Sequence, residues 1–387
     1  MPLSAAHRNL TEPCPPPRQA QPPPPRRAYR RAVGLAVVLL LPGLAGCTSG
    51  PGQQGPAPAT SSATAAAVET ITEDLDAPWS ITFTADGIPL VSERGTARIL
   101  ELDADGGARD VGTIDGVGPR GEGGLLGIAA HEGYLYTYFT GRGENRIERR
   151  ELTGTPGALG LGPAQTLLAG IPAGAIHNGG RIAFGPDGML YATAGDAGNS
   201  EKAQDRAALA GKILRLEPDG AVPDDNPFPA SPVYSYGHRN PQGLAWDADG
   251  TLYASEFGQN TWDELNVIDP GGNYGWPAVE GAAGAEAADG PDFVDPVQQW
   301  EPAAASPSGI AVAGGSIWIA NLRGERLREV PLDDTGTATE YLVGEYGRLR
   351  DVVTAPDGAL WVLTNNTDGR GSPAPGDDRI LRVDVGA

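Results

Sequence analysis

The sequence predicts an all-β fold, a six-bladed β-propeller built from four-stranded antiparallel sheets. Six times along the chain, an apolar doublet runs into a tight glycine turn and then into an aromatic or aliphatic strand. Asp-Gly or Gly-Gly between two alternating apolar runs is the strongest short-range signal for a β-hairpin, because both central positions can adopt positive φ. The copies are ITFTADGIPLVSE from Ile81, LLGIAAHEGYLYTY from Leu125, IAFGPDGMLYAT from Ile182, LAWDADGTLYAS from Leu244, IAVAGGSIWIAN from Ile310 and VVTAPDGALWVL from Val352.

The spacing of these hairpins is that of propeller blades. Their second turn residues are Gly87, Gly133, Gly188, Gly250, Gly315 and Gly358, at intervals of 46, 55, 62, 65 and 43 residues. A lone hairpin cannot bury its apolar face, whereas four-stranded sheets packed around an axis can. The uneven intervals indicate that the connecting loops differ, and loops are where such a scaffold carries its chemistry. An all-β sandwich with chance turns is the alternative.

Composition agrees with one large β domain. The chain has 387 residues, of which 56 are Gly and 36 are Pro, as expected when many short strands are joined by tight turns. We assign the propeller to residues 69–387.

The first 46 residues are predicted to be an export signal. A Pro- and Arg-rich stretch precedes the apolar run AVGLAVVLLLPGLAGC, which is short for a membrane-spanning helix and ends in small residues. Its last four residues resemble a bacterial lipobox, in which Cys47 becomes the lipidated first residue; cleavage at an ordinary nearby site is the alternative. Residues 47–68 are expected to be a flexible tether. We therefore expect an exported lipoprotein at the extracytoplasmic face of the cell membrane.

The net charge limits the classes of partner that the protein can bind, and the cysteine content limits the disulfides that it can form. The formal net charge is −21, and loss of the six Arg and one Glu within residues 1–46 would take it to −26. So acidic a protein repels nucleic acid and anionic headgroups, which argues against both as partners. Export would also remove Cys14, leaving Cys47 without an internal disulfide partner.

His177 is the candidate catalytic base. Beyond the export segment the chain has three histidines, His131, His177 and His238. His177 immediately precedes the third repeat and is followed by Asn178 and a Gly pair, which allows close approach of the backbone. Imidazole at the mouth of a propeller suits proton abstraction from a sugar or alcohol hydroxyl. A loop histidine bonded to backbone carbonyls is the alternative.

Two further groups of residues surround the fourth to sixth repeats. Segments 255–266 and 271–277 contain carboxylates, amides and Gly-exposed carbonyls, the hard oxygen ligands that calcium takes; a solvated acidic loop is the alternative. Four arginines lie in loops at the entry or exit of a predicted blade: Arg239, Arg323, Arg348 and Arg350. Converging on one rim, they would form a pocket for carboxylates, whereas singly each could form an ordinary salt bridge at a strand end.

Four segments of the chain are distinctive: HNGGRIAFGPDGMLYATAGD, YGHRNPQGLAWDADGTLYASEFGQNTWDELNVIDPGGNYGWP, GEGGLLGIA and RLRDVVTAPDGALWVLT. On these segments the chain resembles the soluble quinoprotein glucose dehydrogenase and aldose sugar dehydrogenase family, over residues 70 to 385. The resemblance implies a six-bladed propeller that uses pyrroloquinoline quinone (PQQ) and calcium to oxidise aldoses at the anomeric carbon. It also implies that electrons pass to a membrane quinone or another acceptor.

The resemblance also implies roles for individual residues. His177 corresponds to the general base, and Arg239 and Asn240 to contacts of the reactive quinone oxygen. Carbonyls of Gly258 and Gln259 would hold the calcium on the cofactor. The remaining implied residues are Arg323, Arg348 and Arg350 as partners of the tricarboxylate cofactor, and Glu264 and Tyr274 as ligands of a second, structural calcium.

Two positions depart from the family pattern. Glu122 stands where the family often has Gln, so that an acid faces an anionic cofactor and must be protonated, paired or turned away. Ile176 replaces an acid that precedes the base in the best-studied branch. Glu122 leaves open a calcium-dependent propeller lactonase or other hydrolase. The acidic surface and the tether would also suffice for a second alternative, a non-catalytic cell-surface binding propeller.

Overall fold

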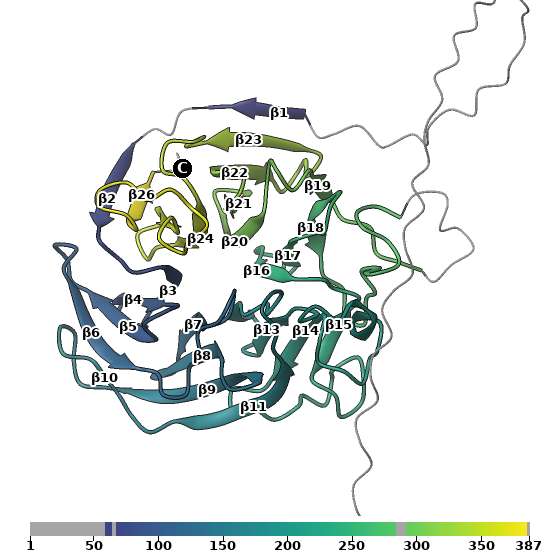
Figure 1. Cartoon of the computed structure of the whole chain (residues 1–387), viewed down its shortest axis with the longest axis horizontal. Coiled ribbons are helices and arrows are strands. Elements are labelled where there is room, and N and C mark those ends of the chain that lie inside the picture. Colours follow the sequence, from purple (N-terminus) through teal and green to yellow (C-terminus); the bar gives the residue numbers. More distant parts are fainter. Residues whose placement is uncertain (1–58, 64–66, 284–291, 385–387) are drawn as a thin grey trace, which may run out of the picture. The chain divides into compact units, whose positions relative to one another are not determined.

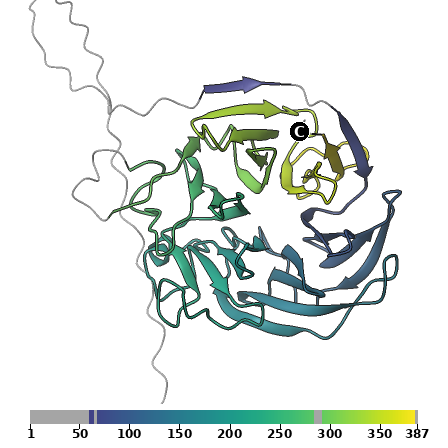
Figure 2. The ribbon, with the colours of Figure 1, turned by 180° about the vertical axis from the view of Figure 1, so that it is seen from behind.

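The computed structural model describes residues 59–63, 67–283 and 292–384. It contains six β-sheets arranged as a ring around a central axis, seen in Figure 1 and from behind in Figure 2. The predicted six-bladed propeller is therefore confirmed. The expected export signal and the lipidation site at Cys47 lie outside the described residues. In the part of the chain that the structure describes, no helix is long and apolar enough to span a bilayer.

The first three strands of each blade run outward from the central axis in chain order, and the outermost strand of blade six comes from the amino-terminal part of the domain. Blade one comprises β3 (Pro78–Phe83), β4 (Pro89–Glu93), β5 (Arg98–Leu102) and β6 (Ala108–Thr113). Blade two comprises β7 (Leu125–His131), β8 (Tyr134–Thr140), β9 (Glu144–Thr153), β10 (Gly160–Leu161) and β11 (Gln165–Pro172). Blade three comprises β12 (Ile182–Phe184), β13 (Leu190–Ala194), β14 (Lys212–Leu216) and β15 (Val233–Tyr236), with the 3-10 turn η1 (Ser200–Ala203) between β13 and β14.

The second half of the ring repeats this order. Blade four comprises β16 (Pro241–Trp246), β17 (Leu252–Glu256), β18 (Asp263–Val267) and β19 (Gln298–Trp300). Blade five comprises β20 (Pro307–Ala313), β21 (Ser316–Asn321), β22 (Arg326–Pro331) and β23 (Thr337–Tyr341). Blade six comprises β24 (Leu349–Thr354), β25 (Leu360–Thr364), β26 (Ile380–Val383) and β2 (Val68–Thr72).

The six predicted hairpins join the first two strands of the six blades, but most of their turns differ from the expected geometry. Positive φ at both central residues occurs in the β7–β8 turn, at Glu132 and Gly133, and in the β20–β21 turn. In the four Asp-Gly turns only the glycine has positive φ, as at Gly87, whose N–H donates to Thr84 O at 2.8 Å. These loops are longer than two residues and use glycine for a single left-handed position.

The ring is closed by a strand from the other end of the domain. β2 pairs antiparallel with β26 and so completes blade six. β1 (Ala59–Ser62) pairs parallel with β23 on the outside of blade five. These four residues belong to the segment that the sequence predicted as a tether, and there the structure differs. The outer edge of β23 offers unpaired backbone groups to any extended chain that passes it.

Apolar packing occurs between the blades. The described residues form six buried clusters, each mainly between two neighbouring blades; the cluster of blades two and three also includes Trp79 of blade one. Successive side chains of a strand point to opposite faces, so one strand serves two clusters. On β4, Leu90 packs toward blade two and Val91 toward blade six. Most of the apolar positions of the repeat therefore hold blade against blade.

The same strand order gathers the functional loops. First and second strands of each blade are antiparallel, so the segment before a first strand and the segment after a second strand lie at the same end of the ring. Twelve connections from six blades therefore converge there. The Asp-Gly and Gly-Gly turns lie at the other end.

Candidate active site

The end of the ring that carries these convergent loops contains a cavity of about 380 Å³. Five arginines line it, and one carboxylate, that of Glu122, faces it. Three of these arginines were predicted as binding residues, and two were missed. The arginines are Arg94, Arg323, Arg348, Arg350 and Arg370. The structure thus brings four of the predicted residues, Glu122 among them, to one opening.

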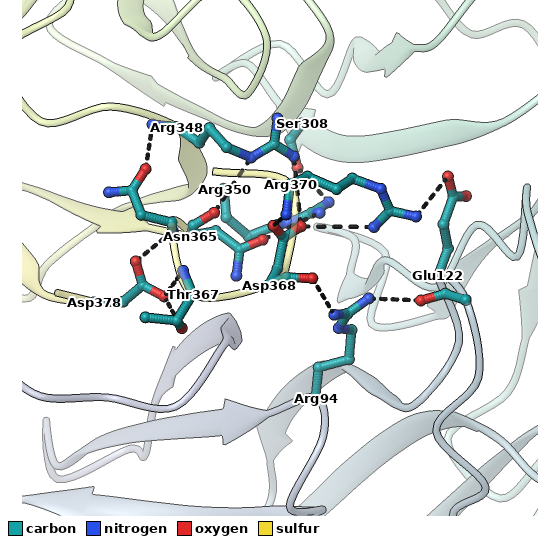
Figure 3. A network of polar contacts seen from close by, with 12 residues as sticks. Arg94, Glu122, Ser308, Arg348, Arg350, Asn365, Thr367, Asp368, Arg370 and Asp378 are labelled. Carbon is teal, nitrogen blue, oxygen red and sulfur yellow. Dashed lines mark hydrogen bonds and ion pairs between the residues drawn. The ribbon is translucent and has the colours of Figure 1, made fainter. Parts of the chain in front are cut away.

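Arg350 is the most deeply buried of the five, and its hydrogen-bond partners are neutral groups, although the charged Arg348, Asp368 and Arg370 are also near it in Figure 3. It donates to Gln242 Oε1 at 3.2 Å, to Ser308 Oγ at 3.3 Å and to Asn365 Oδ1 at 3.5 Å. Its Nε atom is buried without a partner among the described residues. Burial, which outweighs the attraction of Asp368, lowers the pKa of Arg350 to about 9. A buried cation with only neutral partners favours an anionic ligand.

Asp368 is the buried counter-charge of this cluster. Its Oδ2 lies 3.5 Å from Arg348 Nη2 and 3.6 Å from Arg370 Nη1, and its backbone carbonyl accepts a hydrogen bond from Arg94. Burial alone would raise the pKa of Asp368, but the positive charges of Arg348, Arg350 and Arg94 hold it below its ordinary value. Five guanidinium groups against two carboxylates leave three positive charges in excess.

His177 lies beside this cavity, in the loop that leads into β12. Its Nδ1 is 2.7 Å from Asp196 Oδ1, and Trp276 Nε1 donates to Asp196 Oδ2 at 2.9 Å. Burial would raise the pKa of Asp196, but hydrogen bonds from His177, Gly198 and Trp276 lower it. An ionised carboxylate only accepts, so Nδ1 carries the proton and Nε2 is left as the basic nitrogen.

The loops that carry His177 and Asp196 interlock closely because glycines line their contact. A Cβ on Gly195 would lie 2.2 Å from His177 O, and one on Gly179 would lie 2.5 Å from Thr193 O. His177 itself has a left-handed backbone, with φ of 57°. Such a conformation in a non-glycine residue costs roughly 1 kcal/mol or more and is kept only where its surroundings impose it.

Glu122 helps to impose that conformation. Its Oε2 accepts a hydrogen bond from His177 N at 2.8 Å, while its Oε1 lies 3.6 Å from Arg370 Nη2. Of the three states expected for this acid, the structure shows it paired. Ile176, the other departure, is 44% exposed beside the base. The acid that orients His177 is Asp196, which lies in the loop that follows β13 of the same blade.

Arg239 and Asn240 lie on the blade-four side. Arg239 Nη1 donates to Phe257 O at 3.1 Å, its guanidinium lies 5.5 Å from the ring centroid of Trp276, and its Nε has no partner among the described residues. Asn240 Oδ1 accepts from Gly179 N at 3.0 Å, which ties blade four to the base loop. Phe257 lines the arginine cavity as well, so Arg239 is next to it.

Gly258 and Gln259 belong to a loop organised by one carboxylate. Glu280 Oε1 accepts the N–H groups of four successive residues, 259 to 262, at 2.5 to 3.3 Å. A Cβ on Gly258 would lie 1.6 Å from Trp262 O, so only glycine fits there. The carbonyls of Gly258 and Gln259 accept no hydrogen bond from any described residue, which leaves them available to a cation. Gln259 is exposed at this rim.

Glu264 and Tyr274 surround a small void of about 10 Å³ together with Glu256, Gly258 and Glu280. Burial and the charge of Glu256 raise the pKa of Glu264. The Tyr274 hydroxyl is engaged elsewhere, donating to Val267 O and accepting from Asp269 N, so any ligand from Tyr274 would be its carbonyl. Within the described ranges, no three His, Cys, Asp or Glu side chains form a metal cluster.

The sequence reasoning missed Asp196, Arg94 and Arg370, although one signal could have found them. All three lie just after the second strand of a blade, in the loops that reach the functional end: Arg94 after β4, Asp196 after β13 and Arg370 after β25. Arg323, which was predicted, follows the same rule after β21. His238 was not named as a base, and in the structure Ser235 and Glu256 bond both of its ring nitrogens.

Comparison with known proteins places this geometry among sugar-oxidising enzymes. The family model "Glucose / Sorbosone dehydrogenase" matches residues 75–381. A solved structure of PQQ-bound aldose sugar dehydrogenase from Streptomyces coelicolor is 52% identical, with a TM-score of 0.77, covering 82% of this chain and 97% of that one.

Two curated relatives are more distant. Aldose sugar dehydrogenase YliI of Escherichia coli is 29% identical over 78% of this chain and 91% of its own length. Quinoprotein glucose dehydrogenase B of Acinetobacter calcoaceticus is 34% identical over 54% of this chain and 52% of its own length.

Proposed function

The chain belongs to the glucose/sorbosone dehydrogenase family, and from that premise we propose that it oxidises aldose sugars at the anomeric carbon to lactones, with PQQ as cofactor and calcium beside it. One observation carries the proposal: a carboxylate-oriented histidine lies next to a cavity that has three positive charges in excess. An anionic quinone cofactor accounts for the excess positive charge, and the histidine beside it accounts for removal of a proton from the sugar.

The residues present fit the cofactor. PQQ is a tricarboxylate, and three uncompensated guanidinium charges complement three carboxylates. Arg323, Arg348 and Arg350 would hold it, and the orphaned Nε of Arg350 supports an acceptor at this depth. When bound, PQQ supplies the two-electron acceptor for the hydrogen of the anomeric carbon.

His177 acts as the general base in this proposal. Asp196 fixes the tautomer, so that Nε2 takes the proton of the anomeric hydroxyl, and it stabilises the imidazolium that results. Arg239, whose Nε has no partner among the described residues, stabilises negative charge that develops in the site. The side chain of His177 is 12% exposed, which limits its contact with water while leaving an approach for substrate.

Calcium is proposed at two places on the blade-four rim. The free carbonyls of Gly258 and Gln259 are hard oxygen ligands, and a ligand's own oxygens would complete their coordination. Glu264 and the carbonyl of Tyr274 are the protein groups for a structural ion. Among the described residues no lysine or arginine forms an ion pair with the buried Glu264. Three carboxylates, those of Glu256, Glu264 and Glu280, line this void against one arginine, Arg239, and this excess of acid supports a cation there.

Reconstitution tests the proposal directly. Purified protein stripped of ligands is incubated with PQQ and calcium, and reduction of a redox dye is followed with a panel of aldoses. Sugar-dependent reduction is expected, with a change in quinone absorbance. Lactone hydrolysis without dye reduction would favour the propeller lactonase, and neither activity would favour the binding propeller. Electron transfer to a membrane quinone and lipid anchoring at Cys47 are further parts of the proposal; dye replacement by quinone vesicles tests the first.

A further inference from the structure

The guanidinium group of Arg370 is held differently from those of Arg94 and Arg348, two other arginines that line the cavity. Arg94 donates to Gly121 O at 2.9 Å and to Asp368 O at 3.2 Å, and Arg348 donates to Asn365 O at 3.3 Å. Arg370 lies within 3.6 Å of two carboxylates, but its side chain donates no hydrogen bond to any described residue. Its five N–H donors therefore remain available.

The loop that carries Arg370 is nevertheless fixed. Its backbone N–H donates to Asp368 Oδ1 at 2.8 Å, while Asp378 accepts from the neighbouring Thr367 and Asn366. The side chain, 41% exposed, extends from this loop across the cavity mouth toward Glu122, as Figure 3 shows. The backbone of Arg370 is thus fixed, while its guanidinium group donates no hydrogen bond to any described residue. This arrangement suits a residue that moves to bind a ligand.

Glu122 opposes Arg370 with one oxygen and supports the base with the other. Its Oε1 faces the guanidinium of Arg370, whereas its Oε2 accepts the N–H of His177, the residue with the left-handed backbone. As the one carboxylate among the described residues that lines the cavity, Glu122 repels an anionic ligand unless a cation compensates it.

We propose that Arg370 is a further anion-binding residue of this cavity, donating to a carboxylate of the cofactor, and that Glu122 sets the cofactor affinity by competing for the same guanidinium. The inference rests on the proposed function, since it takes PQQ as the anion. It assigns separate tasks to the two oxygens of Glu122: Oε1 tunes binding, and Oε2 positions His177.

The binding of PQQ to calcium-loaded protein, followed by fluorescence or calorimetry, tests the first task. R370Q is expected to bind PQQ about tenfold or more weakly, because a charge-assisted bond is lost and Glu122 is left unpaired. E122Q is expected to bind severalfold more tightly, about threefold or more, because Arg370 is released. The double variant is expected within about threefold of wild type, since attraction and repulsion disappear together.

Matched controls remove one charge from the same protein away from the cavity. R120Q changes an exposed arginine in the loop that carries Glu122, and E151Q changes an exposed glutamate on β9. Both are expected to bind PQQ as wild type does. Thermal melting of every variant verifies folding, and R370K, which keeps the charge but not the fork, is expected to fall between R370Q and wild type.

The second task has its own readout in kcat. Glutamine retains an acceptor for the N–H of His177 and alanine does not, so E122A is expected to have a kcat about tenfold below that of E122Q. Equal kcat values for the two variants would remove the positioning role.

The binding results separate this inference from the proposed function. If wild-type protein binds PQQ but R370Q binds as tightly as R120Q, or if E122Q binds more weakly, the inference fails and the proposed function stands. Absence of PQQ binding by the wild type would overturn both.

Discussion

The two sides of the cavity are built differently. On the blade-three side, Nδ1 of His177 and Nε1 of Trp276 both hydrogen-bond to Asp196, so the base is oriented by protein groups alone. On the side of blades five, six and one, guanidinium groups outnumber carboxylates, and Arg350 is buried among neutral groups. The protein therefore orients its proton-transfer groups with its own hydrogen bonds. The excess positive charge of the arginines, in contrast, is left for an anionic ligand to neutralise.

The largest effect should come from removing the base. His177→Ala is expected to lower kcat by at least about 10³-fold, because general-base catalysis is lost. PQQ affinity should stay near that of wild type, since the arginines are untouched. Steady-state dye reduction and PQQ titration measure the two quantities. Loss of the folded state in circular dichroism would instead assign His177 a structural role.

Next in size is the loss of two arginines from the other side. Arg348→Ala with Arg350→Ala should weaken PQQ binding by about 10²- to 10⁴-fold, because each charge-assisted bond contributes roughly 1.5 to 3 kcal/mol. At saturating PQQ, kcat should fall much less than in the His177 variant. Equal losses of binding and kcat in both variants would abolish the distinction between the two sides.

Asp196→Asn is expected to lower kcat by about 10²-fold with little change in PQQ affinity, because the tautomer of His177 is no longer fixed. The variant also has a pH signature. The pKa of Asp196 is lowered in the folded protein, so its ionised form contributes stability that is present above about pH 4 and lost as the pH falls through the folded pKa. Melting temperatures from pH 7 to pH 3 should therefore converge for the two proteins; a constant difference would contradict this account.

Removal of calcium should affect stability as well as activity. A ligand at 100 times its Kd adds about 2.7 kcal/mol to the folded state, so chelation should lower Tm by several degrees and added calcium should restore it. Glu264→Gln is expected to reduce this calcium-dependent rise, whereas Glu151→Gln, at an exposed position on β9 of blade two, should leave it intact. An unchanged Tm on chelation in the wild type would argue against the structural ion.

The smallest expected effect is a change in stability on the arginine side of the cavity, and it tests most directly how the two sides differ. Arg350→Met should raise the stability of PQQ-free protein by about 1 kcal/mol, because a buried cation without an acidic partner is replaced by an apolar group. The same variant should bind PQQ more weakly. Chemical denaturation in the absence and presence of PQQ measures both changes. A loss of stability without PQQ would show that Arg350 is satisfied by its neutral neighbours.

The sequence predicted the fold because its signals are local. Each hairpin combines a period-2 apolar pattern with a glycine turn, and six copies at blade spacing specify the ring. The pairing of β2 with β26 left no such signal, because it joins segments about 300 residues apart through backbone hydrogen bonds that any β-prone segment can make. The Asp-Gly turns were assigned the wrong geometry because loop length, which the dipeptide does not reveal, decides φ at the Asp.

The site residues that could be predicted are those that a local sequence pattern marks. Arginines that flank a repeat in an acidic chain stand out, as Arg348 and Arg350 do. Asp196 could not be separated from dozens of other acids by composition, since its role depends on the His177 contact across the blade. The pairing of Glu122 likewise required knowledge of where Arg370 reaches.

The pairing of β2 with β26 determines when the ring can close during synthesis of the chain. Blade six carries Arg348, Arg350 and Arg370, and it is completed only when β26, near the carboxyl end, meets β2, near the amino end. On a growing chain the ring stays open until β26 has left the ribosome. Capture of the cofactor is thus a post-translational event, and a truncated chain that lacks β26 would be unable to retain it.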